Sequence, residues 1–108
     1  MAITEKERAS EEVAERHVDF ELALSNKRKY PVQEFRAFVQ SARRYIVMTE
    51  HDALIHKNVA RAVHGLREYL AVERKRVPAD ILFEADRLEC ELFVGYDPAF
   101  EGEEPRGL

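Results

Sequence analysis

The sequence predicts an all-α fold of about four helices in an antiparallel, bundle-like arrangement, followed by an extended acidic C-terminal tail. Alanine, glutamate, lysine, leucine and arginine make up 55 of the 108 residues, close to the share of roughly one-half that is typical of long helices. Threonine, which favours strands, occurs only twice, and the glycines and prolines fall mostly at the ends of segments. The chain therefore offers little material for a β-sheet.

The first helix is expected to begin near residue 5. Thr4 and Glu7 fit a capping box, in which each side chain satisfies a free backbone N–H at the start of a helix. The apolar positions that follow have helical spacing and predict one core-facing stripe: Ala9, Val13, His17, Phe20 and Leu24. Cations at residues 27–29 suit a helix C-terminus, and Pro31 prevents simple continuation.

The second helix has the clearest periodicity in the chain. Its apolar positions alternate at spacings of three and four, as in a coiled-coil seam: Val32, Phe35, Val39, Ala42, Ile46 and Thr49. Phe38 and Tyr45 widen this seam on one side. We therefore expect the helix to contact more than one neighbour.

The apolar phase slips after Thr49, which predicts a turn near residues 50–52. The next stripe consists of Ile55, Val59, Ala62, Leu66 and Leu70, and either Thr49 or Asp52 is expected to cap this third helix. Because no glycine or proline forces a break here, a single bent helix over residues 32–76, about 67 Å long at 1.5 Å per residue, stays open as the alternative.

Gly65 lies inside the third helix, where glycine costs about 1 kcal/mol relative to alanine. We expect it to permit the close approach of another helix. The third helix is expected to end at the cationic residues 73–76, and Pro78 then begins a fourth helix. Its core positions are Ile81, Ala85, Leu88 and Leu92, with Gly95 as the C-terminal cap.

The chain is expected to form a helical domain over residues 1–96 and an extended C-terminal tail over residues 97–108. Tyr96 and Phe100 are the expected anchors that hold this tail on or near the second and third helices of the same or a partner subunit. A chain this short buries only a modest core, so a homodimer is expected. The expected dimer interface consists of Phe35, Phe38, Val39, Ala42, Ile46, Val59, Ala62 and Leu66.

Charge is distributed unevenly along the chain. The net charge is −4, but residues 27–76 carry twelve basic and five acidic side chains, an excess of +7 that leaves −11 elsewhere. Charge complementarity within the chain or between subunits is one interpretation, and an anionic partner is the other. The candidates for contacting an anionic partner are Arg43, Arg44, Lys57, Arg61, Arg67 and Arg74.

A metal site is a weaker hypothesis. His51, Asp52 and His56 are near in sequence, and a carboxylate and an imidazole one helical turn apart share an ion in many metal sites. His64 is two turns further on, and the E-x-x-H pattern of di-iron bundles is absent from the sequence. We therefore assign no metal ligand and expect no cofactor.

The sequence offers no recognisable catalytic group. The lone Cys90 lies between two glutamates, which disfavour its thiolate, and His17 lies on the core stripe of the first helix. Glycine-rich phosphate-binding motifs are missing as well. Uninterrupted apolar stretches reach only three residues, and no secretory signal begins the chain, so we expect a cytoplasmic protein without membrane contact.

These observations favour a small non-enzymatic helical protein–protein interaction protein, an adaptor or regulator, that forms a homodimer. The alternative is a small regulator that binds nucleic acid through the basic second and third helices, although no compact helix-turn-helix spacing is present. A metal-binding helical protein is the third hypothesis.

Overall fold

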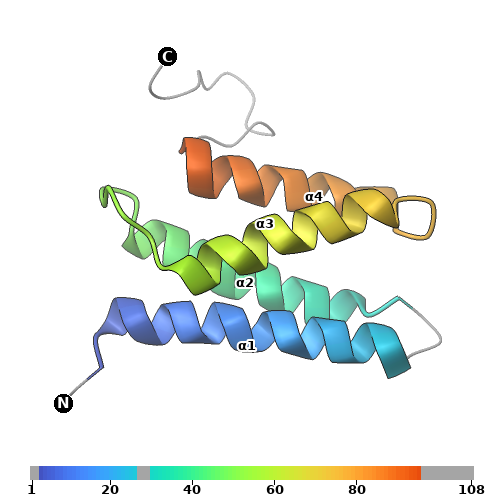
Figure 1. The fold of residues 1–108 in the computed structure, drawn as a ribbon, viewed down its shortest axis with the longest axis horizontal. Coiled ribbons are helices and arrows are strands. Elements are labelled where there is room, and N and C mark those ends of the chain that lie inside the picture. The colour runs from blue at the N-terminus through green and yellow to red at the C-terminus, as the bar shows by residue number, and fades with distance from the viewer. Residues whose placement is uncertain (1–2, 27–29, 96–108) are drawn as a thin grey trace. The chain divides into compact units, whose positions relative to one another are not determined.

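The computed structural model describes residues 3–26 and 30–95, and the chain divides into two compact units, Met1–Ala62 and Val63–Leu108. Helices account for 79% of the described residues, and no strand occurs among them. The all-α prediction is therefore confirmed. The elements are α1 (Glu5–Asn26), α2 (Val32–Met48), α3 (Lys57–Val72), α4 (Ala79–Glu89) and a π-helical turn, η1 (Cys90–Val94), as drawn in Figure 1.

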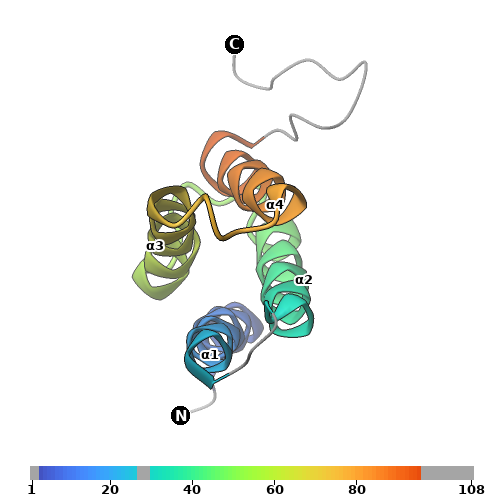
Figure 2. The same ribbon diagram turned by 90° about the vertical axis from the view of Figure 1, so that its right-hand side faces the viewer.

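In the first unit, α1 and α2 run antiparallel and pack side by side (Figures 1 and 2). The Thr4 hydroxyl accepts a hydrogen bond from the Glu7 backbone N–H at 3.1 Å, so α1 begins where its capping signal predicts. Val13 and Phe20 of the predicted stripe are fully buried. The ring of Phe20 lies 5.6 Å from that of Phe35, a tilted geometry that aromatic pairs prefer.

The buried face of α2 is rotated from the predicted seam. Phe38 and Tyr45, which we expected only to widen the seam, are completely buried, whereas Val32 and Ile46 are only half-buried. Aromatic side chains bury more apolar area than branched aliphatic ones, so α2 is oriented with Phe38 and Tyr45 at the centre of its buried face. Periodicity correctly located this helix but not the centre of its inner face.

The predicted break after α2 is confirmed, and the alternative of one bent helix over residues 32–76 is wrong. Thr49 ends α2 and its hydroxyl donates a hydrogen bond to the Tyr45 carbonyl oxygen at 2.9 Å. The prediction that Thr49 or Asp52 caps the next helix is also wrong, because α3 begins only at Lys57. Beyond α2, residues 49–56 form a non-helical connection.

In the second unit, the last part of α3 is followed by α4, which starts after Pro78 as predicted. Three of the four expected core residues, Ile81, Ala85 and Leu88, are buried, and the fourth, Leu92, is half-buried within η1. Gly95 ends η1 with a φ of +87°, and its N–H donates to the Cys90 carbonyl oxygen at 3.0 Å. The predicted glycine cap is therefore confirmed.

Gly65 does not mark a close approach within the described chain. A Cβ atom placed on it meets no heavy atom within 4 Å. Gly65 is exposed beside His64, on the side of α3 opposite the buried Leu66 and Leu70. The described chain therefore provides no helix in close contact with Gly65, and the approach of a helix from a second copy stays a prediction.

Candidate functional site

The residues expected to line a dimer interface are almost all buried within the single chain. Only Ile46 is half-buried, and the other seven have exposed fractions of 0 to 6%: Phe35, Phe38, Val39, Ala42, Val59, Ala62 and Leu66. A seam of this kind looks the same in sequence whether it faces another copy or the chain's own core. The structure corrects the assignment of these residues, and the existence of a homodimer stays a prediction.

His56, one of the metal candidates, takes part in a partly buried polar contact with Tyr45. The Tyr45 hydroxyl oxygen lies 2.7 Å from Nδ1 of His56 and accepts a hydrogen bond from the His56 backbone N–H at 2.8 Å. Because a backbone N–H can only donate, the hydroxyl proton of Tyr45 is available to Nδ1. The contact joins the middle of α2 to the residue just before α3 and occupies one of the two ring nitrogens through which a histidine can bind a metal.

The other metal candidates also have structural surroundings. Asp52 forms an ion pair with Lys6 at 2.7 Å, and His51 is largely exposed beside Glu50. Asp52 and His56 lie in the non-helical connection, so the one-turn spacing we expected between them is absent. Within residues 3–26 and 30–95, no three histidine, cysteine, aspartate or glutamate side chains gather as a metal site.

Two of the basic candidates, Arg44 and Arg67, are paired with acidic side chains inside their own unit. Arg44 of α2 forms an ion pair with Glu12 of α1 in the first unit. In the second unit, Arg67 donates a hydrogen bond to Asp86 at 3.0 Å and lies 3.9 Å from Glu89. The hydrogen bond that Arg67 donates to Asp86, with the nearby charge of Glu89, raises the pKa of Arg67. These contacts support charge complementarity within the chain as one role of the basic segment.

The remaining basic candidates are more dispersed. Lys57 and Arg61 are exposed one turn apart at the start of α3, and Arg74 lies exposed in the turn after it. Arg43 is half-buried and lines a pocket on α2. A phosphate-binding surface needs several cations that are not already neutralised, and at least two of the six candidates, Arg44 and Arg67, are held in ion pairs.

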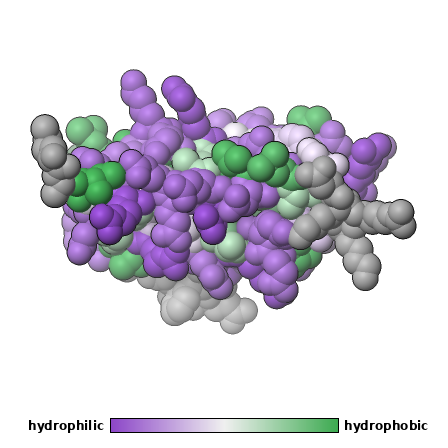
Figure 3. Space-filling model, turned by 90° about the horizontal axis from the view of Figure 1, so that it is seen from below, coloured by the Kyte–Doolittle hydropathy of each residue, from purple (hydrophilic) through white to green (hydrophobic). Residues whose placement is uncertain are grey.

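Exposed apolar side chains were not among the predicted site residues. Figure 3 shows a mainly hydrophilic face on which hydrophobic residues gather in small patches. On α1, Val18 and Leu22 are exposed one turn apart, opposite the buried Val13 and Phe20. On α2, Val47 is 67% exposed at the rim of the pocket.

A further group of exposed apolar side chains lies on α4 and η1. Phe83, Phe93 and Val94 are 54%, 48% and 53% exposed, and Cys90 is half-buried beside them. Phe83, Cys90 and Val94 are spaced seven and four, a helical repeat that places them on one side. The sequence contains this second repeat, but our prediction used only the stripe that begins at Ile81 and so missed the second apolar side of the helix. We call the row Phe83, Cys90, Phe93 and Val94 the outer row.

The remaining candidates fall into two groups. His17 is half-buried, with Nε2 3.0 Å from Glu21 and its ring 5.8 Å from that of Phe38, which suits a structural side chain. The tail anchors Tyr96 and Phe100 lie outside the described residues, so the predicted docking of the tail stays a prediction.

The chain matches no protein-family model, no curated protein and no solved structure. Among the described helices, none combines the length and apolar character needed to cross a membrane. Function must therefore be inferred from the surfaces themselves.

Proposed function

We propose that this chain is a non-enzymatic helical interaction protein that forms a homodimer through the outer row of α4 and η1. The observation that carries the proposal is the exposure of Phe83, Phe93 and Val94 on a helix whose other side is already buried. One buried stripe is enough to attach a helix to its own chain. A second apolar row with aromatic side chains supports a second neighbour.

A second copy is the occupant that the row itself favours. A two-fold axis near Arg87 pairs α4 antiparallel with its equivalent, and places Phe83 against the η1 end of the other subunit. Such an interface is isologous, because the same row contributes both halves. Arg87 already lies 2.8 Å from Glu84 and 3.7 Å from Glu91, so its charge near the axis is compensated.

The strength of this dimer is expected to depend on the aromatic side chains. Phenylalanine and valine in the outer row add apolar area, and aromatic residues frequently supply most of the binding energy of an interface. A contact built mainly from one helix per subunit lies at the small end of specific interfaces. We therefore expect a dissociation constant of roughly micromolar size.

The mass of the chain in solution tests the proposal. Light scattering and sedimentation at rising concentration are expected to approach twice the 12.6 kDa of one chain. Phe83→Asp and Val94→Asp are expected to give a monomer with unchanged helical circular dichroism, because both side chains are exposed. Val47→Asp, at a still more exposed site on α2, is the matched control and is expected to leave the dimer intact.

Two outcomes contradict the proposal. A wild-type mass of 12.6 kDa across the micromolar range removes the homodimer, and an intact dimer in both aspartate variants removes this interface. Strong retention on heparin that salt abolishes would favour the nucleic-acid alternative instead, with Lys57 and Arg61 as the first residues to change. Stoichiometric metal in the purified chain would favour the third hypothesis.

A further inference from the structure

The outer face of α3 carries a regular row of exposed positions. Their steps along the helix are four, four, three and four, which keep them on one side: Lys57, Arg61, Gly65, Glu68 and Val72. Val72 is 80% exposed, and Tyr69, beside the end of the row, is 49% exposed. We call these five positions the α3 row. It begins with two cations and ends with an apolar side chain.

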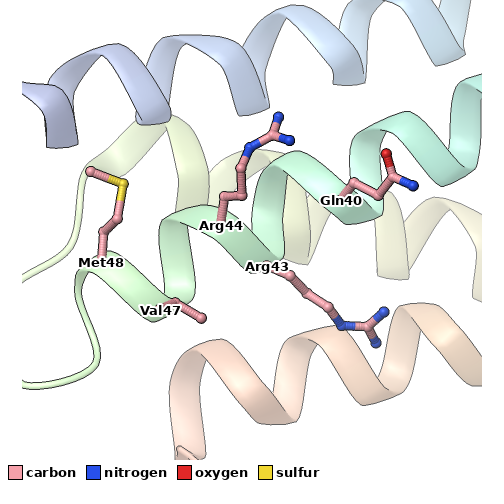
Figure 4. A pocket seen from close by; sticks show the side chains of 5 residues that line it. All are labelled: Gln40, Arg43, Arg44, Val47 and Met48. Atoms are coloured by element: carbon pink, nitrogen blue, oxygen red, sulfur yellow. The ribbon is translucent and has the colours of Figure 1, made fainter.

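The cations of the α3 row differ from the arginine of α2 that is already paired. Arg44, which lines a pocket on α2 (Figure 4), forms an ion pair with Glu12 of α1. The side chains of Lys57 and Arg61 have no hydrogen bond or ion pair within the described part of the chain. Their charges are therefore available to carboxylates that another molecule brings.

Gly65 occupies the middle of the α3 row, and its own surroundings do not require a glycine. Its backbone is helical, and a Cβ atom placed on it meets no heavy atom within 4 Å. Glycine inside a helix costs about 1 kcal/mol relative to alanine. Because glycine lacks a side chain, it lets another backbone come close. A helix from outside the chain is the neighbour that uses this space.

The outer face of α1 carries a matching row of opposite charge. Its exposed positions follow the same steps of four, four, three and four: Glu7, Glu11, Glu15, Val18 and Leu22. The Glu11 carboxylate has no partner among the described residues, and Glu15 lies 3.6 Å from Arg16, its neighbour in sequence. Val18 and Leu22 are 53% and 58% exposed. We call these five positions the α1 row, in which three carboxylates precede two aliphatic side chains.

We propose that the α1 row of one copy packs parallel on the α3 row of a second copy. Because the two rows have the same spacing, one alignment brings every position of one row opposite a position of the other. The first two carboxylates of α1 face the two cations of α3. Glu15 then lies over Gly65, and Leu22 lies against Val72. An antiparallel alignment would instead set carboxylates against apolar side chains, so charge favours the parallel direction.

Glu68 is the one position of the α3 row without a complementary partner, because Val18 lies opposite it. Its carboxylate is 3.8 Å from His64 and 3.4 Å from Arg67, so its charge is compensated within α3. Tyr69, next to it, supplies the apolar surface that Val18 covers. The mismatch therefore leaves no carboxylate without a cation.

A second copy is the favoured occupant, because the chain itself carries the complementary row. The contact joins two different surfaces and is heterologous, so it adds chains to the dimer formed by the outer row. Exposed ion pairs contribute little each, and few apolar side chains take part. We therefore expect a dissociation constant of roughly 0.1 to 1 mM, well above that of the outer-row dimer.

The test uses full chains that carry Phe83→Asp, so that the outer row does not contribute and the two proposals fail separately. Isotope-labelled chain is studied by nuclear magnetic resonance from about 50 μM to about 1 mM at low salt, a range that brackets the expected dissociation constant. Amide signals of the α1 and α3 rows are expected to shift together as concentration rises. Added salt is expected to reduce the shifts.

Exchange of charges between chains locates the contact. Glu11→Lys and Arg61→Glu are each expected to weaken self-association about fivefold. Mixing the two variants is expected to restore it, because the new lysine of one chain faces the new glutamate of the other. Glu5→Lys and Arg74→Glu change exposed charges outside both rows. Their mixture has the same net charges and is the matched control, with no gain expected.

Gly65→Leu tests the close approach of the helices. It is expected to weaken self-association about tenfold. Thermal stability is expected not to fall, because the space beside Gly65 is open within the chain. Circular dichroism of every variant checks that the helices are retained.

Several results overturn the proposal. Amide signals that stay constant up to about 1 mM remove the contact. An equal gain from the control mixture, or no gain from mixing Glu11→Lys with Arg61→Glu, removes the pairing of the two rows. Unchanged association of Gly65→Leu removes the close approach. A short single-stranded oligonucleotide that binds Lys57 and Arg61 more tightly than the second copy does assigns the α3 row to nucleic acid instead.

Discussion

Aromatic side chains lie inside the first unit but on the surface of the second. Phe20, Phe38 and Tyr45 of the first unit are completely buried. In the second unit, Phe83 and Phe93 are about half exposed, while aliphatic side chains such as those at positions 70, 81 and 88 fill the buried positions. The rings of the first unit stabilise its core, whereas those of the second lie partly exposed to solvent.

This contrast separates side chains that stabilise the fold from exposed side chains that contribute little to it. Burying a large apolar side chain contributes a few kcal/mol to folding, and an exposed ring forgoes most of that contribution. The second unit is therefore expected to tolerate changes at its rings that the first cannot accept. The predictions below test this difference, beginning with the largest expected effect.

Phe38→Ala is expected to destabilise the chain by about 3 to 5 kcal/mol, because it leaves a cavity at a fully buried position. Phe83→Ala is expected to change the free energy of unfolding by less than about 0.5 kcal/mol when the chain is monomeric. Urea unfolding at low protein concentration measures both. Equal losses in the two variants would remove the contrast between the units.

Tyr45→Phe is expected to cost about 1 to 3 kcal/mol, because the lost hydroxyl leaves the His56 backbone N–H and Nδ1 without their partner. Tyr69→Phe in the second unit is the matched control. Its ring is 49% exposed, so water replaces the lost hydroxyl and little change is expected. A loss of stability in Tyr69→Phe as large as in Tyr45→Phe, by thermal unfolding, contradicts this interpretation.

Thr4→Ala is expected to cost about 1 kcal/mol through the loss of the side-chain cap of α1. Thr4→Ser keeps the hydroxyl and is expected to restore most of the stability. The helix α4 begins after Pro78, which provides no side-chain cap, so it has no equivalent sensitivity. Amide exchange in the first turn of α1 should report the loss directly, and unchanged exchange there would show that the cap contributes nothing.

Arg67→Ala is expected to have the smallest effect, at most about 1 kcal/mol, because exposed ion pairs are screened by water. The same limit is expected for Arg44→Ala in the first unit. High salt should reduce both effects further. A larger, salt-resistant loss at Arg67 would show that its contacts with Asp86 and Glu89 hold α3 and α4 together more firmly than the exposure of Arg67 suggests.

The helix boundaries could largely be predicted from sequence, because local groups determine them. The hydroxyl of Thr4, the ring of Pro78 and the left-handed backbone of Gly95 each act within a few residues, and all three positions are confirmed. The break after α2 was also predicted from a change of phase in the apolar pattern. Such signals depend little on the rest of the fold.

The surfaces could not be predicted in the same way, because periodicity does not say what faces a stripe. The seam of α2 and α3 was assigned to a second copy, but it forms the chain's own core. The outer row was missed because the helix has two apolar sides. The spacing of Asp52 and His56 suggested a shared ion only while both were assumed to be helical.

The contact between Tyr45 and His56 also has a consequence for the order of folding. It closes a loop of only eleven residues, whereas Asn58 reaches Ser10 across forty-eight. Short loops lose less chain entropy on closing, so contacts of small sequence separation form early. We expect α2 and the start of α3 to dock before α1 joins them. Kinetic φ-values should accordingly be higher for Tyr45→Phe than for Asn58→Ala.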